Sequence, residues 1–133
     1  MTAPDQNHDC PDFWLAQGCR LCQTEQYVPA IAAFDRAIEL YPRSSQAWNY
    51  RGNALSAMQR CAEAFAAYDR AVALEAGYHQ AWFNRGLLLA EMLAYGEALA
   101  SYERAIKLHP DPRYVHARDA IWVKRRLVAP VQW

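Results

Sequence analysis

The sequence has no excess of charge and no long apolar run. Its 14 Lys and Arg residues balance 14 Asp and Glu residues. Nucleic acids and anionic membrane surfaces are usually bound through a basic excess, so this balance argues against both as partners. No stretch approaches the roughly 18 apolar residues that suggest a membrane span. The segment 1–12 is polar and acidic, without the apolar core of a signal peptide. We therefore expect a cytoplasmic protein with no membrane insertion.

Cysteine and glycine are also scarce. Four cysteines do not make a disulfide scaffold in a chain of 133 residues, and there are only 5 glycines. The chain instead has 5 Trp, 8 Tyr and frequent alanine, which is typical of helices packed around large aromatic side chains. Hydrophobic residues make up 53% of the sequence, as in a globular protein, and the length suits one domain.

Large and small residues recur every 34 positions. Trp14, Trp48 and Trp82 keep this step. The columns in phase with them are Gly18/Gly52/Gly86, Ala30/Ala64/Ala98, Phe34/Tyr68/Tyr102, Ala37/Ala71/Ala105 and Leu40/Leu74/Leu108. Within each copy the apolar spacing is helical, and Gly or Ala at a helix crossing lets two backbones approach while aromatic side chains fill the remaining space. The sequence therefore predicts three helix pairs, at 11–44, 45–78 and 79–112.

The two ends of the chain fall outside these repeats. Segment 113–128 begins a fourth copy and then diverges, and a terminal repeat needs a polar outer face. We expect a C-terminal capping helix there, a flexible segment at 1–10 and a tail at 129–133. The residues expected on the apolar side of the capping helix are Tyr114, Ala117, Ala120, Ile121, Val123 and Leu127.

This pattern resembles the tetratricopeptide repeat family. The family signature is Trp-x2-Leu-Gly-x2-Tyr, then Ala-x3-Phe, Ala and Pro, with a period of 34. In the middle repeat the first part is Trp48-Asn49-Tyr50-Arg51-Gly52, with Arg51 in place of Leu, and Ala76 stands in place of the final Pro. The resemblance implies an all-α, right-handed solenoid of three helix-turn-helix repeats plus a capping helix. It also implies a non-enzymatic protein-binding module that acts as an adaptor or assembly scaffold.

The resemblance further implies a peptide-binding groove along the first helices of the repeats. The side chains at the family's groove positions are nearly uncharged here, with several amides beside an apolar patch. Amides offer donors and acceptors to a peptide main chain, and an aromatic anchor suits one large side chain. The expected partner is another protein or a largely neutral peptide segment, although asparagine at these positions is also simply common in the family. The candidate groove residues are Leu15, Cys19, Gln46, Asn49, Asn53, Gln80, Phe83, Asn84, Leu87 and Arg118.

Some co-chaperone members of the family hold a C-terminal carboxylate with a clamp of Lys, Asn and Arg. In the better of two alignments, this chain matches the clamp at Asn53, Asn84 and Arg118 and lacks both lysines. Because the charge-assisted hydrogen bonds of the lysines are missing, we do not expect binding of chaperone tails.

Two other functions stay open. Exposed aromatic residues on the terminal repeats, with Trp133 as an arm, could join copies of the chain into a homo-oligomer. A metal or thiol site could form at Cys10, Cys19 and Cys22 with His8, because zinc accepts these ligands. However, Cys19 and Cys22 fall within a helix of the repeat pattern and no second C-x2-C follows, which favours a packing role. No catalytic motif is present, so we expect neither enzymatic activity nor a cofactor.

Overall fold

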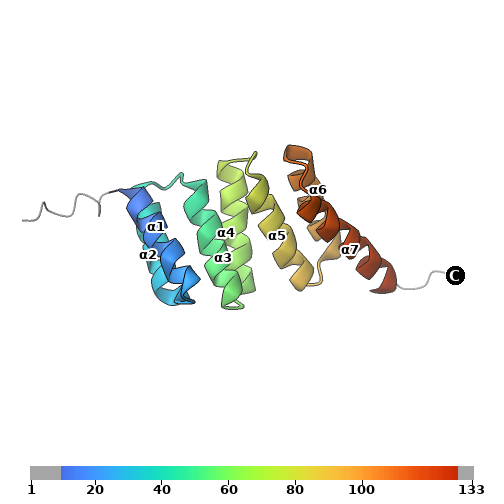
Figure 1. Ribbon diagram of the computed structural model, residues 1–133, viewed down its shortest axis with the longest axis horizontal. Coiled ribbons are helices and arrows are strands. Elements are labelled where there is room, and N and C mark those ends of the chain that lie inside the picture. Colours follow the sequence, from blue (N-terminus) through green and yellow to red (C-terminus); the bar gives the residue numbers. More distant parts are fainter. Residues whose placement is uncertain (1–9, 129–133) are drawn as a thin grey trace, which may run out of the picture. The chain divides into compact units, whose positions relative to one another are not determined.

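The computed structural model describes residues 10–128 as a succession of α-helices, with no strand among these residues. The helices are α1 (Pro11–Gln23), α2 (Tyr27–Leu40), α3 (Ser45–Ala57), α4 (Cys61–Leu74), α5 (His79–Glu91), α6 (Tyr95–Leu108) and α7 (Pro112–Val128) (Figure 1). The predicted all-α class is confirmed. The first helices of the three pairs begin at Pro11, Ser45 and His79, the first residues of the predicted repeats. The expected flexible start and the tail with Trp133 lie outside the described residues.

The helix ends follow from local chemistry. Ser44 precedes α3, and its hydroxyl oxygen accepts a hydrogen bond from the backbone N–H of Ala47 at 3.2 Å. This N-cap satisfies a donor that has no partner within the helix. The turn inside each pair has one residue with positive φ, namely Glu25 at 59°, Gln59 at 61° and Leu93 at 63°. Such a left-handed residue ends a helix and reverses the chain, and here no glycine is used for it.

Glycine and an aromatic ring meet where the two helices of a pair cross. A Cβ atom on Gly52 would lie 2.6 Å from the ring of Tyr68, and one on Gly86 would lie 2.6 Å from the ring of Tyr102. Both rings are buried. The first pair has the same kind of contact. The close approach predicted from the repeating columns is therefore confirmed.

Internal contacts divide the chain after Ala76 into two compact units. The N-terminal part, described here over residues 10–76, holds α1 to α4 and a core around Leu15 and Phe34. The C-terminal part, described over 77–128, holds α5 to α7 and buries Leu89 and Tyr102. Within 10–128 no helix combines the length and the apolar character needed to cross a membrane.

The last helix, α7, is turned about its axis relative to α5. Tyr114 is 2% exposed, whereas Gln80, which holds the same repeat position in α5, is exposed. Conversely, Trp122 is 46% exposed, whereas Leu88 at the same position in α5 is 1% exposed. The face of α7 that is buried therefore corresponds, by repeat position, to a face that is exposed to solvent at Gln80 in α5.

Only part of the predicted apolar side of α7 is buried. Tyr114 and Ile121 are buried as expected, but Val123 is 59% exposed and Leu127 is 80% exposed. The prediction was wrong for these two residues. Leu127 stands at the repeat position of Leu93, which is 71% exposed in the turn of a complete repeat, and Val123 is exposed because no second helix follows α7 within the described residues. In the complete repeats, the position of Val123 is covered, as it is for Leu55.

Candidate functional site

A cavity of about 290 Å³ opens between α5 and α7 in the C-terminal part. The residues of each wall lie one turn apart on one face of their helix. Most of the lining is aliphatic, with one carboxylate and one ammonium group. The lining residues are Leu87, Ala90 and Glu91 of α5, Tyr102 of α6, and Ala117, Ala120, Ile121 and Lys124 of α7.

The hydroxyl of Tyr102 is the polar group supplied by α6. Burial, together with the negative charge of Glu91, raises the pKa of Tyr102 to about 12. The hydroxyl therefore stays protonated at neutral pH and can donate a hydrogen bond to a carbonyl group. Within the described residues, neither Glu91 nor Lys124 forms an ion pair, so both charges are available to a ligand.

An aromatic cluster joins Tyr102 of the cavity lining to neighbouring rings of α5 and α7. The ring of Phe83 stacks on Tyr114 with 4.4 Å between centroids and lies 5.5 Å from the ring of Tyr102. His79 Nδ1 and the Tyr114 hydroxyl are hydrogen-bonded at 2.8 Å, and the His79 ring stacks on His109 at 4.4 Å. Burial and the nearby His109 lower the pKa of His79. Phe83, which the sequence suggested as an aromatic anchor for a ligand, thus joins α5 to α6 and α7.

The other predicted groove residues of this part differ in how open they are. Leu87 is 41% exposed and lines the cavity, and Gln80 is exposed. Asn84 is half-buried. Arg118 is also half-buried, and its Nε donates a hydrogen bond to Asp119 Oδ1 at 3.2 Å. Of these residues, Leu87 lies in the cavity lining.

Half of the predicted groove residues lie in the N-terminal part. Asn49 is 2% exposed, so its amide is not open to a ligand. Asn53 is exposed, and its Oδ1 accepts a hydrogen bond from the Tyr68 hydroxyl at 2.6 Å, which fixes the amide. The remaining three are Leu15, which is buried in the core, Cys19, which is half-buried against it, and Gln46, which is exposed. Of the three predicted amide side chains in this part, those of Gln46 and Asn53 are thus exposed, and that of Asn49 is buried.

The cysteines of α1 do not show the features of a reactive or metal-binding site. Burial raises the pKa of Cys19, and burial together with Cys19 raises the pKa of Cys22. Both thiols therefore stay protonated at neutral pH, and the protonated form is a poor nucleophile and a poor ligand. Between residues 10 and 128 no three His, Cys, Asp or Glu residues lie where they could hold a metal ion, so Cys10 does not complete such a group. His8 lies outside the described residues.

Sequence reasoning missed most of the wall that α7 contributes. Ala117, Ala120 and Ile121 were expected on the apolar side of α7, but not as part of a groove, and Lys124 was not among the residues expected on that side. Their spacing of three, four and seven residues is visible in the sequence and places them on one helix face. Which way that face points depends on the rotation of α7 about its axis, and this rotation leaves no local signal.

Comparisons with known proteins identify the repeat. A family model described as tetratricopeptide repeat matches residues 79–112, the third predicted repeat. A second model, described as protein prenyltransferase alpha subunit repeat, matches residues 29–58. No protein with a curated description matches the sequence.

Solved structures show the same fold. The first tetratricopeptide domain of Spaghetti (RPAP3), bound to the HSP90 peptide SRMEEVD, is 22% identical, with a TM-score of 0.83 over 90% of this chain and 94% of that one. The first such domain of human RPAP3 is 20% identical, with a TM-score of 0.84 and coverage of 92% and 99%. The Arabidopsis OM64 domain is 20% identical, with a TM-score of 0.79 and coverage of 84% and 93%. These likenesses confirm the predicted solenoid fold class.

Proposed function

Because this chain belongs to the tetratricopeptide-repeat proteins, we propose that it is a protein-binding module, an adaptor or assembly scaffold without enzymatic activity. The observation that carries the proposal is the cavity between α5 and α7. Its lining is mostly aliphatic, and its polar groups are the Glu91 carboxylate, the Lys124 ammonium group and the Tyr102 hydroxyl. Aliphatic walls around a few polar groups are suited to binding a ligand side chain.

The ligand that fits this cavity is a largely neutral peptide segment. Leu87, Ala90 and Ala120 offer apolar surface to one aliphatic or aromatic side chain. The Tyr102 hydroxyl can donate to a main-chain carbonyl of the same segment. The charges of Glu91 and Lys124 cancel, so the cavity has no net attraction for an acidic or a basic ligand.

An acidic chaperone tail fits less well. The Spaghetti domain was solved with the peptide SRMEEVD, which carries three acidic side chains. Aligned on the clamp pattern, Asn49 and Tyr114 stand at the two lysine positions of this chain, and both are buried. Arg118 is already paired with Asp119. We therefore propose a neutral segment as the ligand in preference to an acidic C-terminus.

Selection from a random 12-residue phage-displayed library tests this proposal, with the full chain as bait. The disruptive variant is Leu87→Glu, which places a charge in the cavity. Its matched control is Leu93→Glu, because Leu93 is 71% exposed, lies outside the cavity and has a positive φ like Glu25 at the same repeat position. We expect peptides with one large apolar residue and little net charge, bound by the wild type and by Leu93→Glu. We expect Leu87→Glu to lose them by at least tenfold in dissociation constant.

Two results would contradict this function. Peptides bound equally by Leu87→Glu would show that the cavity is not the site. Tight binding of SRMEEVD by the wild type, with no neutral peptide selected, would show that the acidic tail is the preferred ligand despite the missing lysines.

A further inference from the structure

The Tyr102 hydroxyl has no hydrogen-bond partner within the described residues, although the side chain is only 1% exposed. Two other buried tyrosines use their hydroxyls. Tyr68 donates to Asn53 Oδ1 at 2.6 Å, and Tyr114 is hydrogen-bonded to His79 Nδ1 at 2.8 Å. In the part of the chain that the structure describes, every fully buried side-chain nitrogen or oxygen has a partner. The Tyr102 hydroxyl is therefore not fully buried, and it is the polar atom that this ring presents to the cavity between α5 and α7.

The second and third repeats differ at the residue beside this tyrosine. Tyr68 and Tyr102 hold the same repeat position, and so do Asn53 and Leu87. The second repeat places an amide oxygen on the tyrosine hydroxyl, whereas the aliphatic side chain of Leu87 cannot accept a hydrogen bond. The third repeat thus has the donor without the acceptor. Donors in such surroundings are nearly always hydrogen-bonded, which points to an acceptor from outside the chain.

Two charged groups line the cavity together with this hydroxyl. Burial and the negative charge of Glu91 raise the pKa of Tyr102, so the carboxylate lies near the hydroxyl. Lys124 adds an ammonium group to the same lining. A ligand therefore meets two donors and one acceptor. A carboxylate ligand has no donor for Glu91, and an ammonium or guanidinium ligand has no acceptor for Tyr102.

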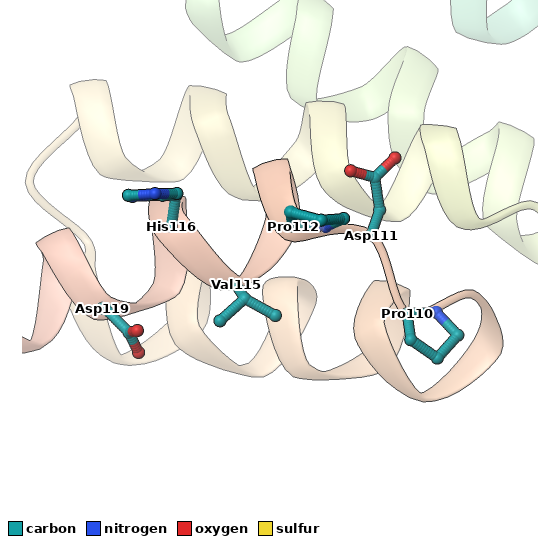
Figure 2. Close-up of a pocket in the computed structure, with 6 residues that line it drawn as sticks. All are labelled: Pro110, Asp111, Pro112, Val115, His116 and Asp119. Carbon is teal, nitrogen blue, oxygen red and sulfur yellow. The ribbon is translucent and has the colours of Figure 1, made fainter.

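A second cavity, of about 360 Å³, is lined by other residues of α7 and of the segment before it. Figure 2 shows this lining, which runs from Pro110 to Asp119. The Asp111 carboxylate accepts hydrogen bonds from Arg113. The Asp119 carboxylate accepts one from Arg118. None of the six lining residues is buried, so this cavity lacks the buried, unpartnered donor found between α5 and α7.

We propose that the cavity between α5 and α7 binds the side-chain amide of an asparagine or glutamine in the ligand peptide. The amide oxygen accepts hydrogen bonds from Tyr102 and Lys124, and the amide nitrogen donates to Glu91. The bound amide thus repeats the contact that Asn53 makes with Tyr68 in the second repeat.

A side-chain amide fits these three groups better than a main-chain amide. In a trans peptide unit the C=O and N–H point in opposite directions, whereas a primary amide presents its oxygen and nitrogen together at the tip of the side chain. This inference rests on the proposed function and narrows it, because it adds an amide residue to the apolar residue that fills the cavity.

Urea unfolding of two matched variants tests whether the hydroxyl is unpartnered in the free chain. Tyr102→Phe and Tyr68→Phe each remove one hydroxyl at the same repeat position, and Phe34 shows that a phenylalanine ring fits there. We expect Tyr68→Phe to unfold at a lower urea concentration than the wild type, because it loses the hydrogen bond to Asn53. Tyr102→Phe should unfold at the wild-type concentration. If it is destabilised as much as Tyr68→Phe, the hydroxyl already has a partner and the proposal is overturned.

Selection from the random 12-residue phage library tests the ligand group, with the full-length wild type, Tyr102→Phe and Tyr68→Phe as separate baits. Tyr68→Phe is the control, because Tyr68 lies outside the cavity. We expect the wild type and the control to enrich Asn or Gln at a constant spacing from the apolar residue, and Tyr102→Phe to enrich the apolar residue alone. In one selected peptide, replacing Asn by Leu or Gln by Met should weaken binding to the wild type about fivefold, in the range of one hydrogen bond. The same replacement should leave binding to Tyr102→Phe unchanged.

The contrary outcomes separate this proposal from the proposed function. Peptides that Leu87→Glu loses, but that show no preference for Asn or Gln, would overturn the amide site and leave the peptide-binding function standing. If Tyr102→Phe weakens peptides with and without an amide equally, the hydroxyl binds a main-chain carbonyl, which also overturns the amide site. A library that gives no peptide at all would contradict both.

Discussion

At the scale of single residues, glycine has two different roles in this chain. Gly86 lies at the crossing of α5 and α6, where an added Cβ would come within 2.6 Å of two ring atoms of Tyr102 and 3.3 Å of the Ala98 carbonyl oxygen. The ring is 1% exposed. Gly96, near the start of α6, has no atom within 4 Å of an added Cβ. The first glycine sets the distance between two helices, and the second does not.

We expect Gly86→Ala to destabilise the protein and Gly96→Ala to stabilise it. Overpacking a buried contact costs about 1–3 kcal/mol, against a gain of about 1 kcal/mol from the better helix propensity of alanine. The net loss for Gly86→Ala is then up to about 2 kcal/mol. For Gly96→Ala there is no overpacking cost, so only the gain in helix propensity remains. This gain is smaller than in a helix interior, because residue 96 is near the start of α6. Urea unfolding followed by circular dichroism measures both. A Gly86→Ala variant as stable as the wild type would show that the Tyr102 ring can yield.

The repeating glycine and aromatic columns made this contact predictable from the sequence. The groove residues were harder to predict, because residues at one repeat position can have different surroundings. Asn49 and Phe83 hold the same position in successive repeats, yet Asn49 is 2% exposed and Phe83 is half-buried against Tyr114. The environment of such a residue depends on what packs against its repeat, and the repeat pattern contains no information about that.

At the scale of helices, a histidine–tyrosine contact links α5 to α7. His79 Nδ1 lies 2.8 Å from the Tyr114 hydroxyl, and His109, the C-cap of α6, stacks on the His79 ring. The titratable groups that act on His79 are His109, which lowers its pKa as burial does, and Asp111, which raises it. The net effect is a lowered pKa, so folding favours the neutral imidazole.

We expect the free energy of unfolding to fall as the pH drops below about 6.5, the ordinary histidine pKa. In that range the unfolded chain binds a proton that folded His79 resists, so stability is lost until the pH reaches the lowered pKa of the folded state. Hydrogen bonds from Arg113 lower the pKa of Asp111 to about 2, and the stability linked to Asp111 is therefore lost only below its ordinary pKa of 3.8.

Urea unfolding between pH 5 and pH 8 measures this dependence. His79→Gln should reduce the slope of stability against pH, because it removes the titrating group. His109→Gln should reduce the slope by less, because it removes one of two causes of the lowered pKa and leaves burial. An undiminished slope in His79→Gln would mean that another group is responsible.

Helix bounds were predictable because capping residues and the repeat period are local. The rotation of α7 was not, because its apolar residues extend around the helix and more than one face can pack inward. The stack of Tyr114 on Phe83 accompanies the observed rotation. As a result, the cavity between α5 and α7 and the exposed Trp122 could be found only in the structure.

At the scale of the whole molecule, three repeats of equal length do not give three equal structural units. Contacts group the first two repeats together and separate them from the third repeat and α7, with the boundary between Ala76 and Gly77. This boundary coincides with the departure of the middle repeat from the pattern, because Ala76 stands where the other repeats have Pro42 and Pro110. Gly77 is exposed, and no atom lies within 4 Å of an added Cβ. The boundary therefore has neither the proline of the other repeats nor a glycine with a close contact at its Cβ position.

We expect Ala76→Pro to stabilise the protein by about 0.4–1 kcal/mol, because proline restricts the unfolded chain. The residue before a proline must be extended, and Glu75 already is, with φ −140° and ψ 93°. These angles match those of Tyr41 before Pro42, −144° and 90°, and of His109 before Pro110, −152° and 103°. The conformation of Glu75 therefore meets the requirement that a proline at residue 76 sets on the residue before it.

The matched control for this prediction is Ala73→Pro, at an exposed position inside α4. It adds the same ring where a helical hydrogen bond must be broken, so it should cost about 3 kcal/mol or more. Urea unfolding compares both variants with the wild type. Stabilisation by Ala76→Pro would show that the missing proline affects only the unfolded chain. If Ala76→Pro destabilises the protein instead, the amide N–H of residue 76 makes an interaction in the folded state that a proline cannot make. The alanine at this turn would then contribute to the stability of the folded protein.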